Sequence, residues 1–534
     1  MEPVGNLPRY QQPSPVSGHH PRVARRWVVA ALCLVSFALV MFTTRSGPGV
    51  EPDSVTYFSA AESLARDGSL ETLGGDSLIV FPPGFSTLIG AGIELGLDAE
   101  QSARWINALC AAATVALGAV LLRRHSKSIA VFAFGVVVFA FSPVTIAVSS
   151  EAMSEPAFIV AILAFLCCLG PRSARLGWQR LAVLVLLVWA ACMFRYLGLV
   201  LVPVGALEIL RRPPADRASR LWRAAGFTVA ALVVPAIWML RNVAAGSGPL
   251  GFRSSAATGL VENARSMVDA MTTWLVPSGV APSARAVLVG LAGGALVLVI
   301  VALVRRSPST REGLRALDPV LTFVVVFIGA LVVSASITAI DVLGTRLLAP
   351  VFVPLVVIGA WGFERCLDVV DSRRAAVALL VAGAALWLIV PLNSTQQIVR
   401  DRSQDGWFYT EARYQESPLL DAAEVVPERD RVFSNDPYAV YFVNDQPRVI
   451  DSPNEGYRTE SEGTVDLSSF ARGVARADHA WLVWFQIHGD PSGYVRPGEL
   501  ADCVDLEPVA HVDDGTLYRL EPLPSPPPKC RWMV

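Results

Sequence analysis

The chain has 534 residues, of which 53% are hydrophobic and only 17% are charged, and its formal net charge is −2. Soluble globular proteins average about 45–50% apolar and about 25% charged residues, and a surplus of apolar residues makes a water-exposed surface adhesive. These values exclude a soluble enzyme, a disordered protein and a basic protein that binds nucleic acid. They indicate a polytopic membrane protein with room for a soluble appendage.

The charge is distributed unevenly along the chain. Residues 393–534 carry 24 Asp and Glu against 13 Lys and Arg, a net charge of −11, whereas residues 1–392 have a net charge of +9. We therefore predict a transmembrane domain over residues 27–392, which contain the hydrophobic runs, and a water-soluble α/β domain over residues 393–534. Residues 1–26 are rich in Pro, Ser and Gln, and we expect them to form a disordered cytoplasmic tail.

Eleven stretches are apolar and long enough, or nearly long enough, to cross a bilayer as a helix, which takes about 20 residues. They are residues 27–42, 103–122, 129–148, 155–169, 181–194, 197–210, 221–240, 286–304, 319–340, 347–363 and 375–391. Two spans within residues 181–210 require a tight hairpin at Arg195 and Tyr196. A single long helix there would instead reverse the sidedness of every later loop.

The basic residues give the sidedness of these spans, because Lys and Arg are enriched in short cytoplasmic loops. With the N-terminus inside, every second loop is basic, from Arg25 and Arg26 at the start to Arg373 and Arg374 before the last span. Eleven spans then place the C-terminal domain on the extracytoplasmic face of the plasma (inner) membrane. That location permits a disulfide between the two cysteines of this domain, Cys503 and Cys530.

The acidic domain contains four short runs that are typical of strands, at residues 432–433, 439–443, 480–485 and 516–520. Residues 434–437, Ser-Asn-Asp-Pro, are a turn or helix-start signal after the first run. Together these features predict a small α/β domain. Five aromatic residues of this domain would line either a carbohydrate surface or the domain core: Trp407, Phe408, Tyr409, Trp481 and Trp484.

The first outer loop, residues 43–102, is the longest connection between the predicted spans. Asp53 and Tyr57 are four residues apart in it, so they share one face if this segment is helical. A purely structural alternative is that Asp53 caps the helix. Residues 85–97 are apolar but short, and we expect a helix there that lies at the membrane surface or re-enters it.

Two carboxylates, Glu151 and Glu155, stand in the short outer turn before the fourth predicted span. Acidic side chains at the mouth of a membrane helix are costly unless they are solvated, paired or bound to a metal. Capping of the helix N-terminus explains one acid. A functional role remains the alternative explanation for the second.

Two arginines lie at the outer ends of predicted spans, against the positive-inside trend. Arg346 follows Asp341 at the start of the tenth span, and Arg241 precedes Asn242 at the end of the seventh. Each side chain either extends to the lipid head groups or holds a phosphate through paired hydrogen bonds.

In their order and sidedness these segments resemble a known family. The segments are Asp-Ser-x-x-Tyr at residues 53–57, Pro-Pro-Gly-Phe at 82–85, Ser-Glu-Pro at 154–156, Arg-Asn at 241–242 and Asp…Arg-Leu-Leu-x-Pro at 341–350. Together they resemble the GT-C superfamily of integral membrane glycosyltransferases, in particular its protein O-mannosyltransferase and lipid A aminoarabinose transferase type. That type has a paired Asp-Glu where this chain has Asp53-Ser54, so only the first acid carries over.

The resemblance implies transfer of a sugar from a polyprenyl-phosphate donor to a hydroxyl of a glycan, lipid or protein, with inversion, on the extracytoplasmic face. It makes Asp53 the candidate catalytic base, and Arg346 first and Arg241 second the ligands of the donor phosphate. The donor's lipid tail would lie in a groove between spans, among membrane lipids. The residues that would orient the acceptor or bind a divalent cation are Glu151, Glu155 and Tyr57.

Two other activities fit a polytopic chain of this composition. One is a transporter or flippase of lipid-linked saccharides, although we find no inverted repeat and the singled-out charges lie in outer loops rather than at mid-membrane. The other is a surface-polysaccharide ligase or polymerase, although the outer loop at residues 243–283 has no dense cluster of Arg and His.

Overall fold

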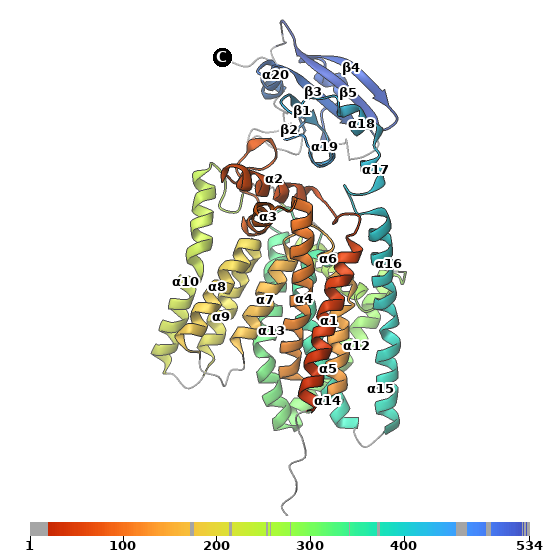
Figure 1. Ribbon diagram of the computed structural model, residues 1–534. Coiled ribbons are helices and arrows are strands. Elements are labelled where there is room, and N and C mark those ends of the chain that lie inside the picture. Colours follow the sequence, from red (N-terminus) through yellow and green to blue (C-terminus); the bar gives the residue numbers. More distant parts are fainter. Residues whose placement is uncertain are drawn as a thin grey trace, which may run out of the picture.

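The structure is a computed structural model. It describes these residues: 20–170, 176–212, 216–251, 255–256, 258–277, 279–340, 342–370, 374–454, 467–486, 493–525, 527 and 530. Residues 1–19 of the predicted tail lie outside this set, as do Arg373 and Asp341. The chain forms a bundle of long helices with a small domain, built on a sheet, at one end of the bundle (Figure 1).

Long apolar helices make up the bundle (Figure 1). Seven spans in the described residues are long and apolar enough to cross a membrane, and they lie in α1 (His20–Thr43), α4 (Ala99–His125), α5 with α6 (Ile129–Ala140 and Pro143–Ser149), α10 (Arg217–Ala244), α12 (Pro282–Arg306), α13 (Pro308–Ala335) and α14 (Thr345–Val370). Other helices of the bundle are α7 (Glu155–Leu169), α8 (Trp178–Phe194), α9 (Leu201–Leu210), α15 (Arg374–Trp387) and α16 (Ile389–Asp405). Each of the eleven predicted stretches overlaps a helix, and the number that crosses a bilayer stays a prediction.

The chain turns back between α8 and α9, as two spans within residues 181–210 require. At one end of α7, Glu155 pairs with Arg195, which follows α8. At the other end of α7, the carbonyl of Leu169 accepts a 2.7 Å hydrogen bond from Arg212, which follows α9. The two helices therefore run in opposite directions, and the alternative of a single long helix is wrong.

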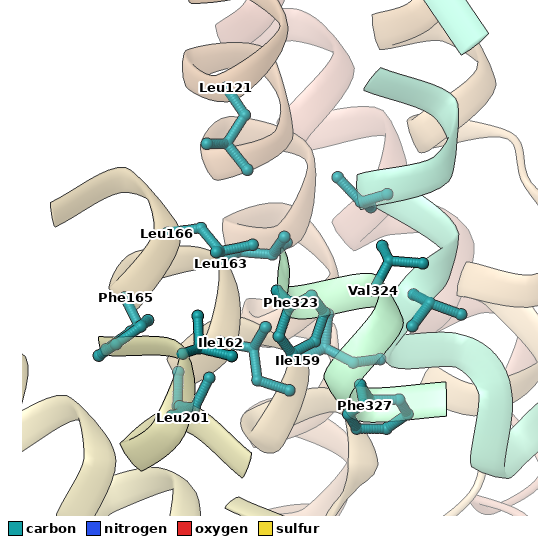
Figure 2. Close-up of a cluster of buried hydrophobic side chains, with 14 of the residues drawn as sticks. Leu121, Ile159, Ile162, Leu163, Phe165, Leu166, Leu201, Phe323, Val324 and Phe327 are labelled. Atoms are coloured by element: carbon teal, nitrogen blue, oxygen red, sulfur yellow. The ribbon is translucent and has the colours of Figure 1, made fainter. Parts of the chain in front are cut away.

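Aromatic and branched aliphatic side chains fill the middle of the bundle (Figure 2). Phe165 of α7 and the pair Phe323 and Phe327 of α13 have no exposed surface. Helices in a membrane gain little from the hydrophobic effect and depend on close packing. Gly205 permits such packing between α9 and α10, because a Cβ at this position would lie 2.5 Å from the Phe227 ring.

Three short elements of the first outer loop lie between the bundle and the sheet domain (Figure 1): α2 (Pro52–Asp67), the 3₁₀ turn η1 (Leu73–Gly75) and α3 (Gly84–Glu94). The helix predicted over residues 85–97 is α3, which has 11 residues and is too short to cross a bilayer. Its Phe85 and Ile89 are buried, whereas Leu88 is 40% exposed. The predicted short helix is therefore confirmed, and its place at the membrane surface stays a prediction.

The C-terminal domain contains a five-stranded sheet in the order β2-β1-β3-β5-β4. The strands are β1 (Arg431–Ser434), β2 (Val449–Asp451), β3 (Ala480–Phe485), β4 (Val504–Val512) and β5 (Gly515–Pro522). β1, β2 and β3 are parallel, whereas β5 is antiparallel to β3 and to β4. The helices of this domain are α17 (Ala412–Gln415), α18 (Pro418–Ala423), α19 (Pro437–Asn444), α20 (Leu467–Ala475) and α21 (Pro497–Leu500).

Residues 439–443, which we predicted to be a strand, belong to the helix α19, so that prediction is wrong. The Asp436 carboxylate accepts a 3.2 Å hydrogen bond from the Ala439 amide, and Pro437 occupies the first turn. An N-cap followed by proline at the first position starts a helix even when β-branched and aromatic residues follow. The helix-start interpretation of residues 434–437 is therefore the correct one.

Most of the aromatic residues singled out in the acidic domain belong to its core. Trp481 and Trp484 are each 6% exposed and Tyr409 is 2% exposed, so these three do not form a carbohydrate surface. Trp407 is 39% exposed, and the guanidinium of Arg402 lies over its ring at 4.5 Å from the centroid. The domain thus uses its aromatic side chains mainly for packing.

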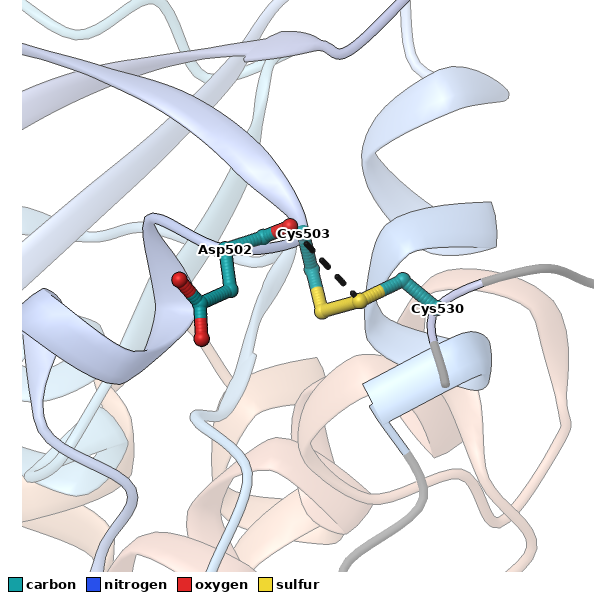
Figure 3. The surroundings of a disulfide bond; sticks show 3 residues. All are labelled: Asp502, Cys503 and Cys530. Carbon is teal, nitrogen blue, oxygen red and sulfur yellow. Dashed lines mark hydrogen bonds between the residues drawn. A yellow bond between two sulfur atoms is a disulfide. The ribbon is translucent and has the colours of Figure 1, made fainter. Parts of the chain in front are cut away.

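Cys503 and Cys530 form a disulfide, with their Cα atoms 5.4 Å apart (Figure 3). The predicted pairing is confirmed. The bond fastens the end of the described chain to the start of β4, and both cysteines are buried. The six other cysteines are free thiols, and all of them lie in helices of the bundle.

We expect this disulfide to be present in membranes, because an extracytoplasmic domain is in an oxidising compartment. When membranes that contain the protein are denatured directly in maleimide, Cys33 and Cys192 should be labelled without reduction, whereas Cys503 and Cys530 should be labelled only after reduction. Peptide mass spectrometry measures the label on each cysteine. Labelling of Cys503 and Cys530 without reductant would place this domain in the cytoplasm and contradict the predicted sidedness.

Candidate active site

The start of α2 carries two carboxylates. Glu51 is the N-cap residue, and its amide donates a 3.1 Å hydrogen bond to the Ser54 hydroxyl. Pro52 occupies the first position and Asp53 follows it. The cap is therefore Glu51, so the alternative that Asp53 serves only as the cap is wrong. Both carboxylates lie at the positive end of the helix dipole, which favours their charged forms.

Arg346, in the first turn of α14, brings three carboxylates together. Its Nη1 atom lies 3.1 Å from Glu51 Oε2 and 3.6 Å from Asp53 Oδ2, and its Nε atom lies 3.6 Å from Glu155 Oε1. The Arg346 side chain is 17% exposed. Residues nearly 300 positions apart in the chain are thus joined at one end of the bundle.

Glu155 is the most buried member of this group. Its side chain is 1% exposed, and its Oε1 atom lies 2.5 Å from Nη1 of Arg195. Glu155 opens α7, Arg195 follows α8 and Arg346 opens α14, so this carboxylate holds three helices together. A buried carboxylate is tolerated only when opposite charge compensates it, and here two guanidinium groups do so.

Tyr57 lies one turn beyond Asp53 on α2. Its hydroxyl is 3.2 Å from the Ser154 hydroxyl, and its ring packs edge-on against Phe85 and at 5.0 Å from Phe81. Burial raises the pKa of the Tyr57 phenol above its ordinary value, and the charge of Arg195 opposes this shift only in part. The phenol therefore stays protonated at neutral pH and retains a proton to donate.

Glu151 forms a separate ion pair. Its Oε1 atom lies 2.8 Å from Nη2 of Arg402, near the end of α16. Burial raises the pKa of the Glu151 carboxyl, and the adjacent Arg402 guanidinium opposes that shift. Glu151 and Glu155 are four residues apart in the sequence, but each has its own arginine partner.

Arg241 does not join the cluster around Arg346 in the described contacts. Its Nη1 atom donates a 2.5 Å hydrogen bond to the carbonyl of Leu78, and its guanidinium lies over the Trp238 ring. The neighbouring Asn242 donates a 2.9 Å hydrogen bond to the Tyr196 hydroxyl. This group fastens the first outer loop to α10. Its predicted role as a second ligand of the donor phosphate stays a prediction.

The carboxylates are poorly suited to a divalent cation. In the described part of the chain no three His, Cys, Asp or Glu side chains are grouped so that they could hold a metal ion. Glu155 and Glu151 each contact a guanidinium, whose positive charge repels a second cation. Binding of a divalent cation at Glu151 or Glu155 stays a prediction.

An apolar pocket lies next to the carboxylate cluster, between α4, α6, α7 and α14. Pro156, directly after Glu155, and Ala349, three residues after Arg346, are part of its wall. The other lining residues are Thr114, Val144, Thr145, Val148, Ser149, Ile159, Phe352 and Val353. Three of these residues carry hydroxyl groups, Thr114, Thr145 and Ser149, and the pocket is a small hollow in the packing of the helices.

Solved structures of other proteins share this architecture. ArnT from Cupriavidus metallidurans bound to undecaprenyl phosphate aligns with 93% of this chain and 98% of its own, at a TM-score of 0.59 and 14% identity. Archaeal oligosaccharyltransferase AglB from Archaeoglobus fulgidus, in complex with an inhibitory peptide and a dolichol-phosphate, aligns with 87% of this chain and 70% of its own. Its TM-score is 0.52 and its sequence identity is 12%. This chain has the GT-C fold.

No protein-family model and no curated protein sequence matches the chain. The fold is nevertheless the one that the resemblance predicted: a helical, polytopic membrane protein with a C-terminal α/β domain. The orientation of the two ends of the chain relative to the membrane stays a prediction.

Sequence reasoning missed three charged residues of this region. Arg195 was noted only as a turn, although a lone arginine in an apolar run of thirty residues is itself a signal. Glu51 precedes Asp53 by two residues, and its carboxylate lies 3.1 Å from Arg346. Arg402 lies at a helix end far along the chain, and no local pattern connects it to Glu151.

We expect Arg195→Met to destabilise the protein by about 3–5 kcal/mol, because loss of one partner leaves a buried carboxylate undercompensated. A melting curve of the purified protein should show a clear fall in Tm. Arg66→Met, which removes one half of an exposed ion pair on α2, is the matched control and should leave Tm unchanged. Equal melting of the Arg195→Met variant and the wild type would contradict the account of Glu155.

Proposed function

We propose that this chain is a glycosyltransferase that moves a sugar from a polyprenyl-phosphate donor to an acceptor hydroxyl on the extracytoplasmic face of the membrane, with inversion. The observation that carries the proposal is the contact of Arg346 with both Asp53 and Glu155. This reaction needs a base and a ligand for the departing phosphate, and in the proposal Asp53 and Arg346, which lie 3.6 Å apart, take these two roles.

The GT-C fold supports the same class of donor. The ArnT structure contains undecaprenyl phosphate and the AglB structure contains a dolichol-phosphate. Both ligands combine a long hydrocarbon tail with a phosphate. The apolar helices of the bundle offer a surface for such a tail, and the guanidinium of Arg346 offers hydrogen bonds to the phosphate oxygens.

The reaction is a single displacement. Asp53 accepts the proton of the acceptor hydroxyl while its oxygen attacks the anomeric carbon from the face opposite the phosphate. The bond between the anomeric carbon and the phosphate oxygen breaks, and the electron pair leaves with polyprenyl phosphate. Arg346 stabilises the charge that develops on this leaving group, so no general acid is required. One displacement at the anomeric carbon inverts its configuration.

Three further residues have narrower roles in this proposal. Tyr57, protonated and hydrogen-bonded to Ser154, is placed to orient the acceptor beside Asp53. Glu155 holds Arg195 and Arg346 and so fixes the phosphate ligand. Because Glu155 and Glu151 are each paired with an arginine, no step is assigned to a divalent cation.

The alternatives make a different product. A transporter or flippase of lipid-linked saccharides would move the donor without forming a new glycosidic bond. A surface-polysaccharide ligase or polymerase would form one, but with a glycan chain as donor. A panel of radiolabelled polyprenyl-phosphate sugars, supplied to membranes that contain the protein, separates these cases through the identity of the labelled product.

In that assay we expect Asp53→Asn to lower kcat at least about 100-fold, because a general base contributes about 10²–10⁴-fold. Arg346→Met should lower kcat/KM for the donor by a comparable factor, because a lost charge-stabilising donor costs about 10²–10³-fold. Asp67→Asn, an exposed acid at the other end of α2, is the control and should retain wild-type activity. Full activity of Asp53→Asn would remove Asp53 as the base.

A further inference from the structure

The backbone that leads into α2 is held between two other segments. On one side, the Gly49 amide donates a 2.8 Å hydrogen bond to the Ser150 carbonyl, and the Ala152 amide donates a 2.8 Å bond to the Gly49 carbonyl. On the other side, Val50 exchanges hydrogen bonds of 3.3 and 3.1 Å with residues 407–409. Two isolated β-bridges thus join three segments, and the chain enters Glu51 and Asp53 from the middle one.

The side chain of Arg402 connects the two outer segments. Arg402 donates from Nη2 to Glu151 Oε1 at 2.8 Å and from Nη1 to the Ser150 hydroxyl at 2.6 Å. The same guanidinium lies over the Trp407 ring. Arg402 therefore contacts residues 150–151 through its charged N–H groups and Trp407 through the flat face of its guanidinium.

The middle segment fits closely between these partners. A Cβ on Gly49 would lie 2.7 Å from the Trp407 ring and 3.3 Å from Cγ of Glu151. No side chain larger than hydrogen can stand there unless Trp407 moves. The position of the middle segment is thus set by Trp407 and Glu151, and both of these residues are held by Arg402.

We propose that Arg402 is a positioning residue that acts through Glu151 and Trp407 to hold the segment at residues 49–51 and thereby to aim Asp53 at the acceptor. The proposal rests on the proposed function in one respect, the role of Asp53 as the base. Arg402 itself touches neither Asp53 nor Arg346 in the contacts of the described residues. Its influence passes through the backbone.

The burial of the pair makes this contact strong. The side chains of Arg402 and Glu151 are 11% and 9% exposed. The side-chain amide of Asn107 also donates a 2.6 Å hydrogen bond to the backbone carbonyl of Glu151. Removal of one partner from such a pair leaves an uncompensated charge, so the remaining group moves toward water. A displacement of about 1 Å at a reacting group can lower a rate about 100-fold, which is why a shift of this segment would reach the chemistry at Asp53.

The test compares Arg402→Met with Arg402→Lys in the full chain, with Arg400→Met as the control. Arg400 lies on the same helix, and its side chain is exposed. We expect Arg402→Met to lower kcat about 10- to 100-fold with the donor KM changed less than about threefold, because the donor phosphate site is intact. Arg402→Lys should restore part of kcat, and Arg400→Met should match the wild type.

Hydrogen exchange provides a second readout that does not need turnover. In Arg402→Met the amides of Val50 and Tyr409 should exchange faster than in the wild type, while those of β3 should not change. Unchanged exchange over residues 47–54 would overturn the proposal, and so would faster exchange with an unchanged kcat. If the wild type transfers no sugar from any donor, the proposed function fails, and the exchange comparison alone still decides whether Arg402 holds this segment.

Discussion

The ion pair network around Glu155 is the constraint on which the rest of the structure depends. A carboxylate with 1% of its surface exposed, at the mouth of an apolar bundle, is tolerated only because Arg195 and Arg346 compensate its charge. These arginines come from the end of α8 and the start of α14, and Arg346 also reaches Glu51 and Asp53 on α2. The same contacts therefore fix the helix ends and assemble the candidate site.

The sheet domain is attached to this site rather than simply appended to the bundle. The Tyr441 hydroxyl of α19 donates a short hydrogen bond to the Glu62 carboxylate of α2, and burial raises the pKa of that carboxyl. Buried side chains of α2, α3 and the sheet domain pack in one continuous cluster. The helix that carries Asp53 is thus held by the bundle on one side and by the C-terminal domain on the other.

Much of the fold could be predicted from the sequence because its signals are local. Apolar runs of helical length marked the bundle, and the charge difference between residues 1–392 and 393–534 indicated an acidic C-terminal domain, although the bundle helix α16 continues past residue 393 to Asp405. Cys503 and Cys530 were correctly paired because they are the two cysteines beyond the last span. The error at residues 439–443 arose because strand propensity was weighed above the Asp436 cap and Pro437, which start a helix.

The site could be predicted only in part, for a physical reason. Glu155 and Arg346 stood out because a charged group at a span end needs an explanation, and Asp53 and Tyr57 stood out because their spacing puts them on one face of a helix in the first outer loop. The structure brings all four together. Which arginine meets which carboxylate depends on how helices distant in the sequence are arranged. That arrangement assigns Arg195 to Glu155, Arg402 to Glu151 and Arg241 to a loop carbonyl, and no sequence spacing reveals it.

The central claim is that Arg346 receives the phosphate of a polyprenyl-phosphate donor next to Asp53. A structure of the full chain with undecaprenyl phosphate tests this most directly. We predict phosphate oxygens within hydrogen-bond distance of the Arg346 guanidinium and the lipid tail along the apolar helices of the bundle. A phosphate bound elsewhere, with Arg346 still paired to Glu51, would contradict the account.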